Sequence, residues 1–244
     1  MRLKGACALI TGGAKRVGKA IALELASAGA NIAITYRSSE KEASQTVFQL
    51  KKAGVKAHAF YAESSSGESV RDCVRQIKSK FGGIDILINS AANFIKIPFE
   101  QLTEQDFDDS IQVNLKGPYL FSVEIGKIML KQKRGKIVNI SDWAGLRPYK
   151  NYIPYCVSKG GLITLTKALA KSLAPHVQVN AILPGAVLLP EDFNRNDKKK
   201  IMKETPLQRI GSPRDIAKTV HFLIEGSDFI TGALIPVDGG RLIA

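Results

Sequence analysis

Short runs of apolar and β-branched residues alternate along the chain with segments in which apolar residues recur every three or four positions. The short runs predict strands at 6–10, 31–36, 56–62, 84–89, 136–141, 177–183 and 233–237. The periodic segments predict a first helix that ends at Gly29 and further helices at 40–53, 66–80, 103–131, 152–174 and 213–225. We therefore expect an α/β fold, a Rossmann-like doubly wound parallel sheet of about seven strands with helices on both faces.

We interpret residues 1–244 as a single domain. The chain is 45% hydrophobic, which is enough for one sizeable core, and no linker, repeat or low-complexity segment interrupts the pattern. One irregular stretch, residues 185–212, follows the carboxyl end of a strand, where such sheets bind ligands. It is polar and contains Pro, so we expect a substrate loop there.

The apolar runs are too short for a signal peptide or for a membrane span, which needs about 18 apolar residues. We therefore expect a cytoplasmic protein with no membrane partner. Cys7, Cys73 and Cys156 show no metal-ligand spacing, and the first and last lie in apolar or helical runs. They predict buried free thiols in a reducing compartment and no metal site.

The formal net charge of +13 would attract nucleic acid, an anionic cofactor or an acidic protein. The Lys and Arg residues are scattered, and their densest runs, at 131–136 and 198–200, contain no interleaved aromatic residues. This pattern argues against nucleic-acid binding and favours a solvated basic surface around an anionic small-molecule ligand.

Three glycines surround the turn between the first strand and the first helix. Gly12, Gly13 and Gly18 would let the backbone approach a pyrophosphate, and the following helix start offers unpaired N–H groups. Lys15 stands where the literal G-x-G-x-x-G pattern has its second glycine, so a purely structural turn is the alternative. The position directly after the first strand favours dinucleotide binding.

The end of the second strand predicts which dinucleotide binds. An NAD-binding chain would place an acidic residue there, whereas this chain has Arg37 and Ser38 after Tyr36. A guanidinium and a hydroxyl suit a 2′-phosphate, and Lys15 and Arg16 add positive charge nearby. We therefore expect NADPH as the cofactor; the alternative is that Arg37 is only an exposed charge.

Tyr155 and Lys159 are spaced i and i+4 on a predicted helix, so they share one face. A free phenol has a pKa of about 10, and a nearby ammonium is expected to lower it toward the operating pH. The phenol could then protonate a substrate that receives hydride. Such a pair is common by chance, and its position after the fifth strand gives it weight.

Six segments in this order, TGGAKRVG, NSAAN, VNLKG, YCVSK, the PG after the sixth strand and VDGG, resemble the short-chain dehydrogenase/reductase family over nearly the whole chain. The resemblance implies that Asn114 supports a proton-relay water near Lys159. It also implies cofactor contacts by Gly12, Lys15, Arg16, Val17, Gly18, Arg37, Ser38, Glu63, Ser64, Asn89, Ala91, Ser141, Tyr155, Lys159, Pro184, Gly185 and Val187. Members of the family are mostly tetramers, and the apolar stretch 160–170 is compatible with a helix interface, so a homotetramer is expected.

Three positions depart from the family pattern. The family usually has Gly at Arg16, Ser at Asp142 and often Thr at Leu189. The first two departures are shared with the pteridine reductases, which NSAANF and YRSS also resemble, and the closing DGGR resembles the dihydromonapterin reductases. By this resemblance Asp142 is the catalytic partner of Tyr155, and Phe94 stacks on the pterin.

The chemistry of a pterin gives a reason for the carboxyl group. A ketone reductase needs a hydroxyl to bind a carbonyl oxygen, whereas a pterin presents ring nitrogens and an amino group that a carboxyl can accept from or protonate. We therefore expect hydride transfer from NADPH to a dihydropterin. Asp142, Tyr155, Lys159 and Asn114 would be catalytic, and Arg16, Phe94, Asp142 and Tyr155 would contact substrate.

Other interpretations stay open. Asp142 could be a turn former, Phe94 a core aromatic and Arg16 a phosphate ligand. The rival activity is 3-oxoacyl-thioester reduction, because the segment from TPLQRIGSPRDIA to VDGG resembles those enzymes too. Asp142 argues against this activity, since a carboxylate repels a developing alkoxide. A non-catalytic dinucleotide sensor is disfavoured by the intact set of Asn114, Tyr155 and Lys159.

Overall fold

The computed structural model describes residues 1–189 and 194–244, and its strands form one parallel sheet. The spatial order is β3-β2-β1-β4-β5-β6-β7. The strands are β1 Cys7–Ile10, β2 Asn31–Tyr36, β3 Ala57–Tyr61, β4 Ile86–Asn89, β5 Gly135–Ile140, β6 Val177–Pro184 and β7 Leu234–Val237. The predicted seven-stranded, doubly wound sheet is confirmed.

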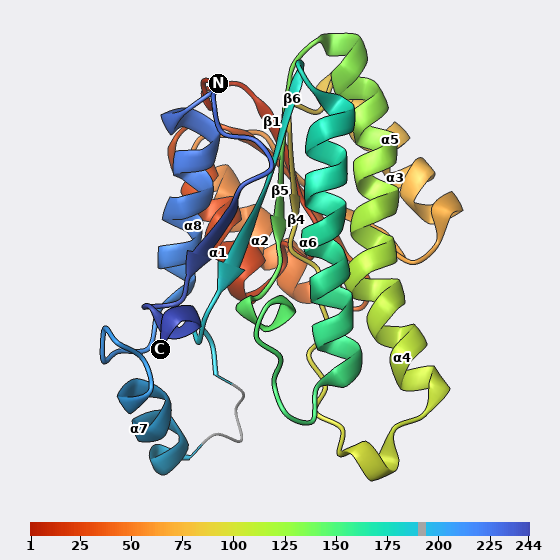
Figure 1. The fold of residues 1–244 in the computed structure, drawn as a ribbon. Helices are drawn as coiled ribbons and strands as arrows, with labels where there is room; N and C mark the ends of the chain where they lie inside the picture. Colours follow the sequence, from red (N-terminus) through yellow and green to blue (C-terminus); the bar gives the residue numbers. More distant parts are fainter. Residues whose placement is uncertain (190–193) are drawn as a thin grey trace.

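Both faces of the sheet are buried, which explains the continuous apolar runs. Neighbouring residues of β1 point to opposite faces, so Ile10 joins the core under one helical layer and Leu9 the core under the other. One layer contains α1 Arg16–Ser27, α2 Glu40–Lys52 and α8 Pro213–His221; the other contains α3 Gly67–Phe81, α5 Gly117–Gln132 and α6 Ile153–Leu173 (Figure 1). In residues 1–189 and 194–244, no helix has both the length and the apolar character needed to cross a bilayer.

The predicted helix 103–131 is interrupted. It consists of α4 Glu104–Ile111, a π-helical turn Gln112–Lys116 and α5. Thr103 and Asp106 form a capping box at its start. Asn114 lies in the π turn and is fully buried. A π turn often marks a functional site, and the spacing of apolar residues gives no sign of one extra residue.

The predicted irregular loop 185–212 contains a helix, α7 Arg195–Lys203, so the prediction of an irregular segment is wrong at these residues. Asn194 and Asp197 form its capping box. The helix has no buried residue, and its sequence is almost entirely polar, so it shows no apolar periodicity. Residues 190–193 of the predicted loop lie outside the described residues.

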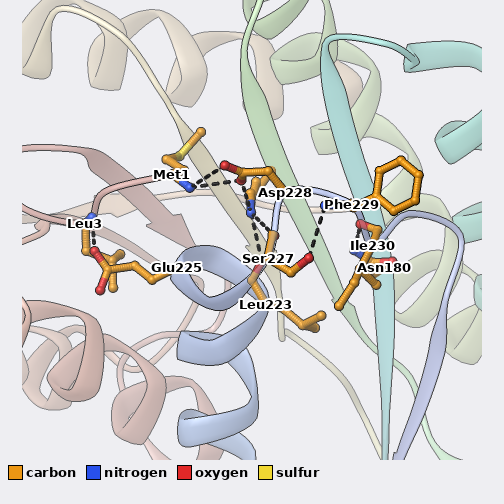
Figure 2. Close-up of polar contacts among 10 residues, drawn as sticks. Met1, Leu3, Asn180, Leu223, Glu225, Ser227, Asp228, Phe229 and Ile230 are labelled. Atoms are coloured by element: carbon orange, nitrogen blue, oxygen red, sulfur yellow. Dashed lines mark hydrogen bonds and ion pairs between the residues drawn. The ribbon is translucent and has the colours of Figure 1, made fainter.

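A buried lysine ties the segment after α8 to β5. Lys136 has 3% of its side chain exposed, and its Nζ donates to the carbonyl oxygens of Leu223 at 3.1 Å and Ser227 at 2.7 Å. The same ammonium lies 2.7 Å from Asp228 Oδ1. Asp228 Oδ1 also accepts from the Met1 ammonium at 2.9 Å (Figure 2). The hydrogen bond from Lys136, and to a smaller extent that from the Met1 ammonium, lowers the pKa of Asp228 to about 2. This cluster fixes the chain entering β7.

Replacing this lysine tests how much the cluster stabilises the fold. In Lys136→Met, the buried Leu223 carbonyl oxygen and the part-buried Ser227 carbonyl oxygen lose their donor, which we expect to cost about 2 kcal/mol. The melting temperature, measured by calorimetry at neutral pH, should fall by about 4–8 °C. Lys131→Met, at an exposed position of α5, should change it little. Equal melting temperatures for the two variants would contradict the assignment.

Candidate active site

A cleft of about 1200 Å³ lies at the carboxyl ends of the strands. Its lining residues follow directly on several strands, such as Ser90 after β4, Ser141 after β5 and Gly185 after β6. The cleft brings together most of the predicted site: Gly12, Lys15, Arg16, Val17, Gly18, Arg37, Ser38, Ser64, Ala91, Phe94, Ser141, Asp142, Tyr155, Lys159, Pro184, Gly185 and Val187. It does not include Glu63, Asn89 or Asn114 among its lining residues.

The glycine turn at the start of α1 is tight. Gly12 has φ +64°, and a Cβ there would lie 2.9 Å from Ala91 Cα. A Cβ at Gly18 would lie 2.5 Å from the Gly12 carbonyl oxygen. The turn thus leaves the backbone and the start of α1 open to a ligand, which is the arrangement that suits a pyrophosphate.

Arg16 has φ +56°, in the left-handed region. A glycine adopts this conformation without steric cost, which explains why glycine suits the position in the resembling family. With Lys15, Arg16 is exposed at the rim of the cleft, so two positive charges stand beside the helix start.

The predicted 2′-phosphate site contains a carboxylate as well. Arg37 Nη1 lies 3.5 Å from Glu63 Oε2, and Glu63 Oε1 accepts from Ser65 Oγ at 2.9 Å. The acidic group therefore follows β3, whereas the predicted choice of nucleotide rests on the residues that follow β2. Arg37 and Ser38 still line the cleft, while Glu63 does not.

The Asp142 carboxyl has two roles, one in the backbone turn after β5 and one beside the Tyr155 phenol. Its Oδ2 accepts from the Tyr155 hydroxyl at 2.8 Å, and its Oδ1 accepts from the Ala144 N–H at 2.7 Å and the Tyr149 hydroxyl at 3.1 Å. The residue therefore caps the short 3₁₀ helix Trp143–Gly145 and also bonds the predicted catalytic phenol. Burial raises the pKa of Asp142, while these hydrogen bonds and Lys159 act in the opposite direction.

Tyr155 and Lys159 lie in the first two turns of α6. Lys159 Nζ donates to the Ile140 carbonyl at 2.9 Å and lies 5.6 Å from the centre of the Tyr155 ring. Burial lowers the pKa of Lys159 to about 8 against the opposing effect of Asp142. The pKa of Tyr155 is raised well above its usual value, mainly by burial and then by Asp142. The predicted lowering of the Tyr155 pKa is therefore wrong, and the phenol keeps its proton at neutral pH.

The two asparagines assigned by resemblance lie beneath the cleft. Asn114 Nδ2 donates to Asn93 Oδ1 at 2.8 Å and Ser158 Oγ at 3.1 Å, and its Oδ1 accepts from the Asn93 N–H at 2.9 Å. Asn89 donates to Asn139 Oδ1 at 2.8 Å. In the described part of the chain, Asn89 Oδ1 is a buried oxygen without a partner. Their roles in proton relay and cofactor binding stay predictions.

Several aromatic side chains pack around the Tyr155 phenol. The Phe94 ring stacks on Tyr152 with centroids 4.4 Å apart and meets the Tyr155 ring edge-on at 4.8 Å. Phe94 is 44% exposed, so the alternative of a core aromatic is wrong. Tyr149 packs edge-on against Trp143 at 5.1 Å. Tyr149 and Tyr152 had no predicted role, although the sequence has three tyrosines within 149–155.

The thiols take no visible part in this chemistry. All three cysteines are buried and free of disulfides, and burial raises the pKa of Cys7 and Cys73 to about 12. Across the described ranges, no three His, Cys, Asp or Glu side chains are grouped to hold a metal ion.

Comparison with known proteins places this architecture in a family. A profile described as enoyl-(acyl carrier protein) reductase matches residues 12–241. The 3-oxoacyl-[acyl-carrier-protein] reductase FabG of Aquifex aeolicus is 38% identical over 248 residues, which cover 98% of each chain. The chain belongs to the short-chain dehydrogenase/reductase family.

Solved structures support a nicotinamide dinucleotide as cofactor of this short-chain reductase. It is similar to NAD⁺-bound xylitol dehydrogenase, with a TM-score of 0.92 and 28% identity over 98% of this chain and 100% of the other. It is also similar to a blue fluorescent protein from a metagenomic library in complex with NADPH, with a TM-score of 0.90 and 32% identity over 99% of each chain. The tight glycine turn and the long cleft fit such a group. The protein is an NAD(P)-dependent oxidoreductase of the short-chain family.

The glycine turn allows a direct test of this cofactor site. In Gly18→Ala, the added Cβ meets the Gly12 carbonyl oxygen, so the turn must open. We expect the dissociation constant for NADPH, measured by fluorescence titration, to rise about tenfold or more, equivalent to at least about 1.4 kcal/mol. Gly67→Ala is the control, because its Cβ would meet only the flexible end of Arg71 at 3.2 Å and would lie in ordinary van der Waals contact with Leu120 Cδ2 at 3.8 Å. Unchanged binding in Gly18→Ala would exclude the turn from the site.

Proposed function

We propose that this short-chain reductase transfers hydride from NADPH to a pterin, in a dihydropterin to tetrahydropterin step. The observation that supports it is the Asp142 carboxyl, which lines the cleft and bonds the Tyr155 hydroxyl at 2.8 Å. A carboxylate accepts hydrogen bonds but donates none, so it suits a substrate that presents N–H groups beside the reacting bond. A carbonyl oxygen at that position would face a negative charge.

In this proposal, the residues of the cleft have separate roles in proton transfer and substrate binding. When bound, the nicotinamide supplies the hydride. Tyr155 keeps its proton at neutral pH and delivers it to the substrate, and Lys159, held on the Ile140 carbonyl, supplies positive charge beneath the phenol. Asp142 accepts from an N–H of the ring or its amino group. Phe94 is 44% exposed and already stacks on Tyr152, so a pterin would stack on the part of its ring that stays open. Arg16 lines the cleft at the start of α1.

Reduction of a 3-oxoacyl thioester is the second candidate, and sequence identity favours it. The relative from Aquifex aeolicus carries that activity in its name and is 38% identical to this chain, which supports the thioester more directly than the pterin. Asp142 stands against it, because a carboxylate beside Tyr155 would repel the oxyanion that forms when a ketone is reduced. Pterin reduction therefore requires the Asp142 carboxylate, whereas thioester reduction is hindered by it.

The cofactor preference also belongs to the proposal. Arg37, Ser38, Lys15 and Arg16 line the cleft and favour the 2′-phosphate of NADPH. Glu63 competes for Arg37 at 3.5 Å, so the phosphate would have to displace this exposed ion pair, which costs little. A homotetramer in the cytoplasm remains the expectation from family resemblance.

Asp142→Ser separates the two substrates. With a dihydropterin, we expect kcat/KM for the variant to fall at least tenfold, since a carboxylate that bonds substrate contributes roughly 1.5–3 kcal/mol. The dissociation constant for NADPH should change much less. With acetoacetyl-CoA, the variant should equal or exceed the wild type, because the negative charge is gone. Rapid thioester reduction by the wild type with an inert dihydropterin would establish the second candidate instead.

Arg37→Ala tests the choice of nucleotide. The variant should raise the KM for NADPH about tenfold, because a charge-assisted hydrogen bond to the 2′-phosphate is lost, and should leave the KM for NADH nearly unchanged. Initial rates with both cofactors at fixed substrate provide the measurement. An equal effect on NADPH and NADH would show that Arg37 does not read the phosphate.

A further inference from the structure

Tyr149 is fixed beside Asp142 by packing from two elements. Its ring meets Trp143 of the 3₁₀ helix edge-on at 5.1 Å, and its backbone N–H donates to Cys156 Sγ of α6 at 3.3 Å. Its hydroxyl donates to Asp142 Oδ1 at 3.1 Å. Because the ring and the backbone are both held, the direction of the hydroxyl is set before any substrate arrives.

The hydrogen bonds on Asp142 divide its two oxygens between separate tasks. Oδ1 takes the Ala144 N–H and the Tyr149 hydroxyl, and Oδ2 takes the Tyr155 hydroxyl. A carboxylate offers about four acceptor positions, so three are filled by the protein and about one stays open on Oδ2. That open position lies beside the phenol that would protonate the substrate.

A small number of described titratable groups face the Asp142 carboxyl. From α6 it is faced by Tyr155, the Lys159 ammonium and, more weakly, the Cys156 thiol. From the turn after β5 it is faced by Tyr149, which in turn lies in the field of Arg241 from the C-terminal segment. Among residues 1–189 and 194–244, Lys159 is therefore the positive group that acts directly on Asp142, and the Tyr149 and Tyr155 phenols are its neutral donors.

We propose that Tyr149 is a positioning residue that, together with the Ala144 N–H, holds the Asp142 carboxylate so that Oδ2 faces Tyr155 and keeps one acceptor position for a substrate N–H. When Tyr155 gives its proton to the substrate, its hydrogen bond to Oδ2 is lost, and the Ala144 bond alone would leave the carboxyl free to rotate about that contact. The second donor on Oδ1, the Tyr149 hydroxyl, removes this freedom. The inference rests on the proposed role of Asp142 in the reduction. It assigns to Tyr149 a function through Asp142, with no contact to the reacting bond.

The test is a double-mutant cycle of Tyr149→Phe and Asp142→Asn. Phenylalanine keeps the ring contacts and removes only the hydroxyl. With a dihydropterin, we expect Tyr149→Phe to lower kcat/KM about three- to tenfold, the usual net size of one ordinary hydrogen bond, because the hydroxyl acts on the substrate only through Asp142. The acid limb of the pH profile should move to higher pH, because the lost donor no longer favours the ionised carboxyl. In the Asp142→Asn background the same change should have no further effect.

The outcomes separate the inference from the function on which it rests. A lower rate in Tyr149→Phe that persists in Asp142→Asn, or one with an unmoved pH profile, would overturn the positioning role. Full activity of Tyr149→Phe beside an impaired Asp142→Asn would overturn it too, while the role of Asp142 would survive. If Asp142→Asn equals the wild type, the proposed function fails first. Tyr119→Phe, a half-exposed phenol of α5, should match the wild type throughout.

Discussion

The hydrogen bond between the Tyr155 phenol and the Asp142 carboxyl is the interaction on which the chemistry of the cleft depends. It joins the end of β5 to the start of α6, and both groups are largely buried there. Burial disfavours the charged form of each group and of Lys159 below them, while the carboxyl and the ammonium favour each other's charge. The three groups therefore titrate as one system, and a change at any of them shifts the protonation of the others.

The sheet explains how distant parts of the sequence supply this system. Strands buried on both faces run parallel, so their carboxyl ends meet at one edge, and the residues that follow them converge there. Gly12 follows β1, Ser141 follows β5 and Gly185 follows β6, and all three line the same cleft. The glycine turn provides room at one end of the cleft. The aromatic group around Phe94 gives the other end a flat, partly open surface that suits a ring more than a flexible chain.

The sequence predicts the sheet well, because strands buried on both faces read as apolar runs and loops read as polar breaks. It also predicts that Tyr155 and Lys159 share one helix face, because they are four residues apart, whereas the place of Asp142 beside Tyr155 is predicted by resemblance to the pteridine reductases. It misses what depends on tertiary context. Helix α7 has no apolar face to detect, and the donor from Tyr149 to Asp142 depends on the path of an irregular turn. The raised pKa of Tyr155 depends on burial that a spacing of four residues does not reveal.

The π-helical turn Gln112–Lys116 also sets which way the long helical stretch faces. It holds one residue more than an α-helical turn, so the surface of α5 is rotated by about 100° from where an uninterrupted helix would place it. α4 packs mainly against α6, and α5 packs against α3. The number of residues between Thr103 and Asn114 therefore determines which way Asn114 and the helix after it face. An insertion or deletion there would rotate α5 about its axis relative to the sheet, even if every side chain stayed the same.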